Sequence, residues 1–132
     1  MTRNRCLFLS ALLPLAFAAQ ASEPDAATLA FADTVAACSA GGFSSPHPFV
    51  KDFTIVHTVV GEKNGACEYS QTMPGNMRME CALSEDGRKA LAEEFREQAK
   101  GRMSGATTDA PAWSAECEIV TRDGKRMPMQ GG

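Results

Sequence analysis

The chain has 132 residues, with 16 acidic and 13 basic side chains and a net charge of −3 at pH 7. This length fits one small domain, whose hydrophobic core is limited by its surface-to-volume ratio. The acidic balance, without a basic stripe, argues against nucleic acid or an anionic lipid surface as a partner, because clustered lysine and arginine bind both.

Residues 1–21 have the pattern of a secretory signal peptide. Two arginines near the start precede an apolar run from Leu7 to Phe17 and the small-residue site Ala19-Gln20-Ala21. The apolar run is shorter than a membrane-spanning helix and contains a proline. We therefore expect cleavage before Ser22 and a periplasmic or secreted chain with no membrane contact afterwards. A single domain over residues 22–132 would remain.

The cysteines predict how this domain is held together. Cys6 belongs to the predicted signal peptide, and four cysteines remain: Cys38, Cys67, Cys81 and Cys117. An even number in a small exported domain indicates two disulfides. The spacings contain no C-x-x-C, so neither a thioredoxin-like redox pair nor a zinc knuckle is suggested.

Residues 22–42 are predicted to form the first helix. Ser22 and Asp25 resemble a capping box, and Gly41-Gly42 would end the helix. Helical spacing places Phe31, Val35 and Cys38 on one face, so Cys38 is expected to point into the core.

The middle of the chain predicts a three-stranded antiparallel meander. After a Ser/Pro loop, residues 53–60 form a β-branched run, and Asn64-Gly65 supplies a hairpin turn. Residues 66–73 and 77–83 alternate apolar with polar side chains around a Pro-Gly turn. The alternation puts Met77 and Met79 on the same face as Cys81, which is typical of a buried sheet face.

A second helix is predicted from Ser84, a suitable N-cap, to Lys100, with Leu91, Phe95 and Ala99 as its apolar stripe. A loop then leads to a final short strand around Cys117, and residues from about 122 are expected to form a loose tail. The order of elements is that of a small α+β domain in which helices cover one face of an antiparallel sheet.

Three disulfide pairings are possible for four cysteines. We expect one bridge to join the first helix to the sheet and the other to join the last strand to the sheet. Our preferred pairing is Cys38 with Cys81 and Cys67 with Cys117. A bridge between Cys67 and Cys81 on adjacent strands is the competing arrangement.

About half of the chain resembles a family of small exported proteobacterial proteins with no assigned function. The shared features are a His-Pro-Phe element at 47–49, a Gly-x-x-x-Gly-x-Cys-x-Tyr element at 61–69, and the Met-Pro and Met-x-Cys elements at 73–81. The resemblance implies export and a disulfide-bonded domain, and it implies no activity. Family members often carry another cysteine just before His-Pro-Phe, where this chain reads GGFSSPHPF, so no pairing is transferred.

The sequence indicates no catalytic residues. Nucleophilic catalysis needs a nucleophile, a base and an orienting group, and the only histidines are His47 and His57. Cysteines that pair in disulfides cannot act as nucleophiles, and no G-x-S-x-G occurs. We therefore expect a non-enzymatic binding domain without a cofactor, whose partner is an envelope protein or a small ligand.

Copper handling is the alternative function. Thioether and imidazole ligands suit Cu(I), and the candidate ligands are His57, Met73, Met77 and Met79. A buried methionine more often fills core, and a single strand histidine is more often a hydrogen-bonded core residue.

His47, Pro48 and Phe49 are the candidate interaction residues, because an aromatic side chain beside a proline can act as a rigid anchor. The competing interpretation, which we favour, is that Phe49 closes the end of the core.

Overall fold

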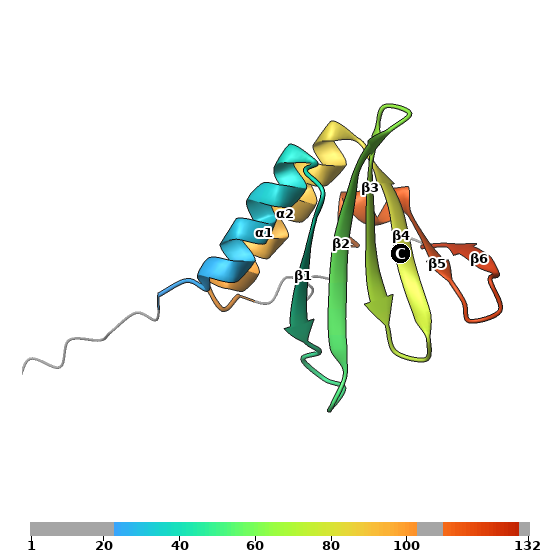
Figure 1. Cartoon of the computed structure of the whole chain (residues 1–132), viewed down its shortest axis with the longest axis horizontal. Coiled ribbons are helices and arrows are strands. Elements are labelled where there is room, and N and C mark those ends of the chain that lie inside the picture. Colours follow the sequence, from blue (N-terminus) through green and yellow to red (C-terminus); the bar gives the residue numbers. More distant parts are fainter. Residues whose placement is uncertain (1–22, 103–109, 130–132) are drawn as a thin grey trace, which may run out of the picture.

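The computed structural model describes residues 23–102 and 110–129, so the predicted signal peptide lies outside the described residues. The elements follow in the order α1 (Ala26–Ala37), β1 (Gly41–Pro46), β2 (Thr54–Lys63), β3 (Ala66–Met73), β4 (Met77–Leu83), α2 (Glu85–Ala99), the short 3₁₀ helix η1 (Ala112–Glu116), β5 (Cys117–Val120) and β6 (Arg126–Pro128). All six strands form one antiparallel sheet in chain order (Figure 1).

The predicted α+β class is confirmed. The three-stranded meander with one final strand is wrong, because β1 and β6 add a strand at each edge and β5 joins the same meander.

The residues of β1 were predicted as the end of the first helix, at Gly41-Gly42, and a Ser/Pro loop, because glycine and proline are disfavoured in strands. It pairs with β2 from Gly41 opposite Val59 to Pro46 opposite Thr54. An edge strand needs a partner on one side only, and a proline is tolerated at such an edge. The partner strand therefore decides the conformation of β1, and it turns Phe43 and Ser45 toward the core.

The prediction of a loose tail is wrong for residues 126–128, which form β6. The turn expected at Asp123-Gly124 is present, and Thr121 N donates to Lys125 O across it at 2.9 Å. Gly124 has a φ of +83°, which glycine adopts without strain. This turn reverses the chain, so that Met127 lies opposite Ile119. Residues 130–132 lie outside the described residues.

The first helix is shorter than predicted, and Asp25 is its N-cap. The Asp25 carboxylate accepts hydrogen bonds from the backbone N–H groups of Ala27 and Thr28. The predicted cap Ser22 lies outside the described residues. Cys38 ends the helix with a φ of +50°, before Gly41-Gly42. As predicted, Cys38 is buried on the same side as Phe31 and Val35.

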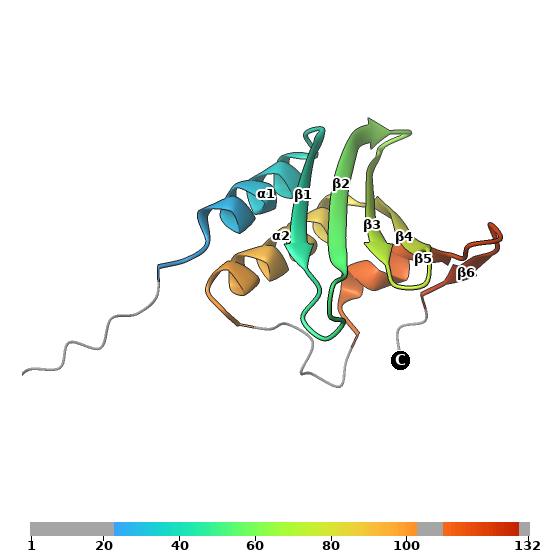
Figure 2. The ribbon, with the colours of Figure 1, turned by 60° about the horizontal axis from the view of Figure 1, so that its bottom comes forward.

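The second helix begins as predicted, and its start is tied to the last part of the chain. The Ser84 hydroxyl accepts from Gly87 N, while the Glu116 carboxylate accepts from both Ser84 N at 2.8 Å and the Ser84 hydroxyl at 2.6 Å. Leu91, Phe95 and Ala99 are buried, as the apolar stripe predicts. Figures 1 and 2 show α1 and α2 side by side on one side of the sheet.

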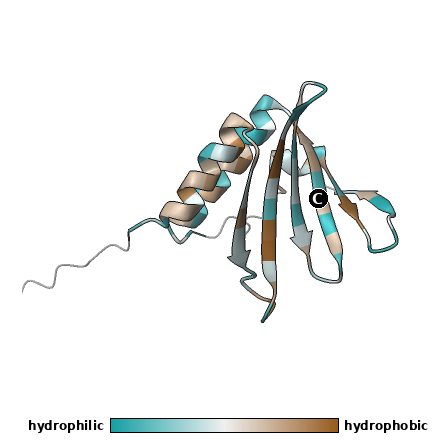
Figure 3. Cartoon of the chain, viewed as in Figure 1, coloured by the Kyte–Doolittle hydropathy of each residue, from teal (hydrophilic) through white to brown (hydrophobic). Residues whose placement is uncertain are grey.

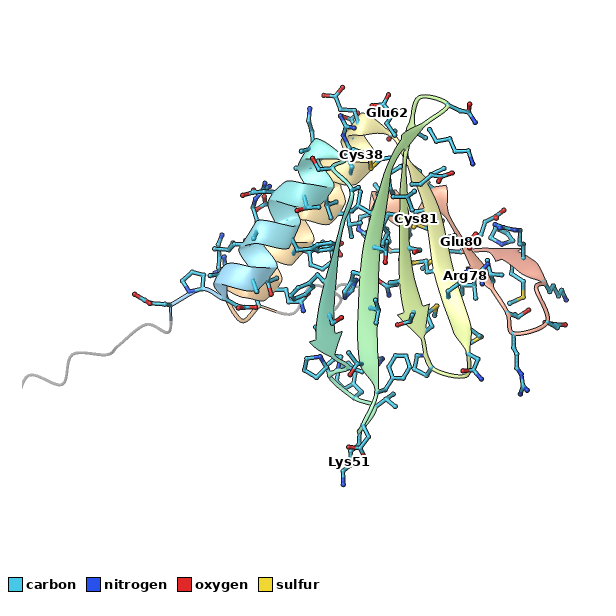
Figure 4. The ribbon with its side chains drawn as sticks, in the orientation of Figure 1. Cys38, Lys51, Glu62, Arg78, Glu80 and Cys81 are labelled. Atoms are coloured by element: carbon cyan, nitrogen blue, oxygen red, sulfur yellow. A yellow bond between two sulfur atoms is a disulfide. The ribbon has the colours of Figure 1, made fainter. Side chains whose placement is uncertain are left out.

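Both disulfides exist, but their pairing differs from the preferred and the competing arrangements. Cys38 is bonded to Cys67, and Cys81 is bonded to Cys117. Cys67 lies opposite Leu83, so Cys67 and Cys81 are not direct neighbours across β3 and β4, whereas Cys81 lies directly opposite Cys117. The expected roles are confirmed, since one bridge joins the end of α1 to the sheet and the other joins β5 to it. All four cysteines are buried, and Figure 4 labels Cys38 and Cys81.

The core lies between the two helices and one face of the sheet, where Val59, Tyr69 and Leu83 are almost inaccessible to solvent. β2 also carries apolar side chains on its other face, with Val60 60% exposed. Figure 3 shows hydrophobic bands of β2 on either side of a more hydrophilic one. Over residues 23–102 and 110–129, neither α-helix has the length and apolar composition that a membrane crossing requires.

Candidate functional site

A pocket of about 320 Å³ lies between the sheet and α2. Its walls include Ser45, His57 and Gln71 from the sheet, Glu94 and Phe95 from α2, and Trp113 from η1. We call this space the Glu94 pocket. Its volume is within the range of small-molecule sites, and it combines aromatic walls with a few polar groups, as such sites do.

The floor of the Glu94 pocket is a chain of hydrogen-bonding side chains around His57. His57 Nδ1 lies 2.8 Å from the Tyr69 hydroxyl, which donates to Gln71 Oε1 at 2.9 Å. Because the single tyrosine hydrogen goes to Gln71, we assign the Nδ1 hydrogen to His57. Nε2 is then left to accept from the Ser45 hydroxyl, 3.4 Å away.

His57 is neutral at pH 7 in this environment. Its side chain is buried and packs against the rings of Phe31, Phe43 and Phe95. Burial disfavours the charged imidazolium and lowers the pKa of His57 to about 4. An imidazole with this pKa is a weak general base at neutral pH, so the Ser45–His57 contact is better suited to binding than to acyl transfer.

Among the described residues, Glu94 is the one carboxylate that lines the Glu94 pocket. It is half-buried, and its Oε1 accepts a hydrogen bond from Trp113 Nε1 at 2.8 Å. Burial raises the pKa of Glu94, and the hydrogen bond from the indole offsets only part of that rise. Among the ion pairs of the described residues, none includes Glu94.

Arg102 also lines this pocket, and its guanidinium forms an ion pair with Glu97. The Arg102 guanidinium makes two contacts with the Glu97 carboxylate, one of them from Nη2 at 3.1 Å. Arg102, followed by Lys100, lowers the pKa of Glu97 to about 2. Because Lys100 shares this carboxylate at 3.1 Å, Glu97 offsets only part of the positive charge of Arg102 and Lys100.

The candidate copper ligands are not gathered into one donor set. Gln71 lies between His57 and Met79 across neighbouring strands, and both nitrogens of His57 have hydrogen-bonding neighbours. Met79 is buried in the core, whereas Met73 and Met77 face each other at the end of the β3–β4 hairpin. Within the described residues, no group of three or more His, Cys, Asp or Glu side chains is arranged to hold a metal ion.

The connection between β1 and β2 presents Phe49 to solvent. Phe49 is 79% exposed, so the interpretation that it closes the end of the core is wrong. The side chain of His47 holds the loop from inside: Nδ1 accepts from Phe49 N at 3.1 Å and from Val50 N at 3.0 Å. His47 N also donates to Phe53 O at 2.8 Å, and the His47 ring packs against Phe53. The loop is thus ordered by its own contacts, and Figure 4 shows Lys51 at its tip.

Pro48 connects the two candidate regions, because it lines the Glu94 pocket and immediately precedes Phe49.

The sequence identified His47, Pro48, Phe49 and His57 as candidates but missed Ser45, Glu94 and Trp113. Sequence signals for these existed: Glu94 precedes Phe95 on the apolar side of a predicted helix, and the chain contains a single tryptophan.

The opposite face of the sheet carries charges that compensate one another. Glu80 contacts Arg78 and Arg126, and Arg126 also contacts Glu118 at 2.9 Å. Arg78, followed by Arg126, lowers the pKa of Glu80. Figure 4 shows Arg78 and Glu80 beside each other on β4. These four charges on β4, β5 and β6 thus pair among themselves.

Comparisons with protein-family models, with curated proteins and with solved structures gave no match for this chain.

Proposed function

We propose that this chain is an exported, non-catalytic binding domain of the cell envelope, and that it binds a partner protein through the loop of residues 47–53. Two disulfides are typical of proteins in a non-reducing compartment, which supports a periplasmic or secreted location. The leader pattern of residues 1–21 supports the same location. The absence of catalysis is supported by two facts: the four described cysteines are used in disulfides, and His57 is a weak base.

The observation that carries the proposal is the exposed Phe49 on an ordered loop. Aromatic side chains are enriched among the residues that dominate protein interfaces, because they bury a large area at a small cost in side-chain entropy. A loop already held by His47 loses little further entropy on binding. Val50 beside Phe49 is also partly exposed and extends the apolar surface. Because the Phe49 side chain is 79% exposed, it contributes little to packing within the chain and is available to a partner.

Phe49→Ala is expected to leave the melting temperature within about 2 °C of the native value, because an exposed side chain contributes little to stability. The same substitution is expected to abolish capture of the envelope partner. In-cell photo-crosslinking from a photoreactive residue at position 49, followed by mass spectrometry, identifies the partner, and co-purification of that partner with the native chain and with Phe49→Ala measures its capture.

Val60 provides the matched control, since it is 60% exposed but lies on the other face of the sheet. A photoreactive residue at position 60 should not give the product formed from position 49, and Val60→Ala should leave capture unchanged. Identical crosslinked products from both positions, or capture that survives Phe49→Ala, would contradict the proposal.

A further inference from the structure

The Glu94 pocket carries a carboxylate, Glu94, that takes part in no ion pair with the described residues. Three other titratable groups face Glu94 from the surrounding elements: His57 on β2, Tyr69 on β3, and Arg102 after α2. His57 is neutral at pH 7, Arg102 is paired with Glu97, and burial together with Glu94 raises the pKa of Tyr69, which keeps it neutral. Among the described residues that line the pocket, Glu94 is the negatively charged group, and the guanidinium of Arg102 is directed to Glu97.

A half-buried carboxylate without a cation is costly, and a bound cation would reduce that cost. Trp113 Nε1 occupies Oε1 and fixes the orientation of the carboxylate. The lone pairs of Oε2 can accept hydrogen bonds from a ligand in the pocket. Trp113 and Phe95 line the same pocket, and aromatic rings also attract cations. An anion is repelled by the Glu94 carboxylate, and a neutral ligand lacks the electrostatic attraction to it.

We infer that the Glu94 pocket binds a small organic ammonium ion. Its ammonium group contacts the Glu94 carboxylate, and its apolar part lies against Trp113 and Phe95. A volume of about 320 Å³ is at the lower end for ligand sites, so the ligand is compact, with one ring or a short chain. This site goes beyond the proposed partner binding and does not depend on Phe49.

Three probes of similar shape test the charge preference: benzylammonium, benzyl alcohol and phenylacetate. Trp113 is the only tryptophan, so its fluorescence and its indole N–H resonance report on the pocket without labelling. Benzylammonium is expected to shift the indole resonance saturably, with a dissociation constant at least about tenfold lower than that of benzyl alcohol. Phenylacetate is expected to give no saturable shift. Equal affinities for benzylammonium and benzyl alcohol, or no saturable shift by benzylammonium up to about 20 mM, would overturn the inference.

Glu94→Gln tests the assigned carboxylate and keeps an acceptor for the Trp113 indole, so the fold should be preserved. This variant is expected to bind benzylammonium at least about tenfold more weakly. Glu93→Gln is the matched control, because Glu93 is the preceding residue of α2 and its carboxylate pairs with Arg96, away from the pocket. Unchanged affinity in Glu94→Gln, or an equal loss in Glu93→Gln, refutes the site.

The pH dependence gives a second, independent readout. Benzylammonium stays charged on acidification, whereas Glu94 takes up a proton at a higher pH than an ordinary glutamate does, because burial raises its pKa. Affinity is therefore expected to fall on acidification. Protonation of His57 near pH 4 acts in the same direction, while Arg102 stays charged and Tyr69 stays neutral. Glu94→Gln should lose most of this dependence, and an affinity that rises on acidification would contradict the assignment.

The two proposals fail separately. Phe49→Ala should leave benzylammonium binding unchanged, and Glu94→Gln should leave crosslinking from position 49 unchanged. Loss of both functions in either variant would show that the loop and the pocket are one site, and it would refute their independence.

Discussion

Replacing Cys38 and Cys67 by alanine is expected to lower the free energy of unfolding by about 3–4 kcal/mol. The bond closes a loop with a sequence separation of 29, and its loss allows the unfolded chain many more conformations. It also releases the end of α1 from β3. Typical domains have a total stability of about 5–15 kcal/mol, so this loss is a large fraction. Urea denaturation of the double variant and the native protein measures it. A loss below about 1 kcal/mol would mean that packing alone holds α1 on the sheet.

A thiol count provides the control for the pairing. In the chain without residues 1–21, which contain Cys6, the variant with both Cys38 and Cys67 replaced should show no free thiol when unfolded and unreduced, because Cys81 and Cys117 remain bonded to each other. Replacing Cys38 and Cys81 instead removes one partner from each bond and should expose two free thiols. No free thiol in this second variant would support the pairing of Cys67 with Cys117 that the structure contradicts.

The folded protein is expected to lose stability as the pH falls from 6.5 to about 4. The unfolded chain takes up a proton on His57 near pH 6.5, whereas the folded chain does so only near pH 4. The unfolded state therefore binds more protons across this interval, and acidification favours unfolding. The difference between these two pKa values corresponds to a loss of about 3 kcal/mol in the free energy of unfolding. For a domain of this size, that loss lowers the melting temperature by about 10 °C or more. Thermal melts at pH 7 and pH 4 measure the change.

Substitutions separate His57 from the other titrating groups. His57→Gln should lower stability at pH 7 but flatten the dependence on pH, whereas His47→Gln, which leaves His57 intact, should retain the slope. Glu94 acts in the opposite direction: its raised pKa contributes stability at low pH that is lost as the pH rises through that pKa. Glu94→Gln should therefore steepen the fall on acidification. An unchanged slope in His57→Gln would show that His57 is not the responsible group.

The elements with strong local patterns were predicted well. Ser84 caps the second helix, and Met79 and Cys81 face the core, because capping and alternation depend on residues close together in the sequence. β1 was missed because its residues have no strand preference of their own and depend on β2. β6 was missed for a related reason: a three-residue strand has too little pattern to recognise, and only its pairing with β5 defines it.

The candidate site was predicted only in part. His57 was identified because there are only two histidines, yet its partners come from other strands and could not be read from spacing. Glu94 looked like one acid among several on a solvated helix face. It gains its distinct environment from Trp113, which lies 19 residues away in the sequence. Phe49 was assigned to the core because large aromatic residues usually pack there, but it is 79% exposed and lies on a loop whose backbone is hydrogen-bonded to His47.

The sequence by itself determined the α+β class, the core-facing faces of the helices and central strands, and the presence of two disulfides. These properties depend on side-chain periodicity and composition, which can be observed directly in the amino-acid sequence. The tertiary structure alone decided which cysteines pair, how many strands join the sheet, and which side chains surround the Glu94 pocket. Each of these depends on the register between segments far apart in the chain, where a shift of one residue turns a side chain to the opposite face.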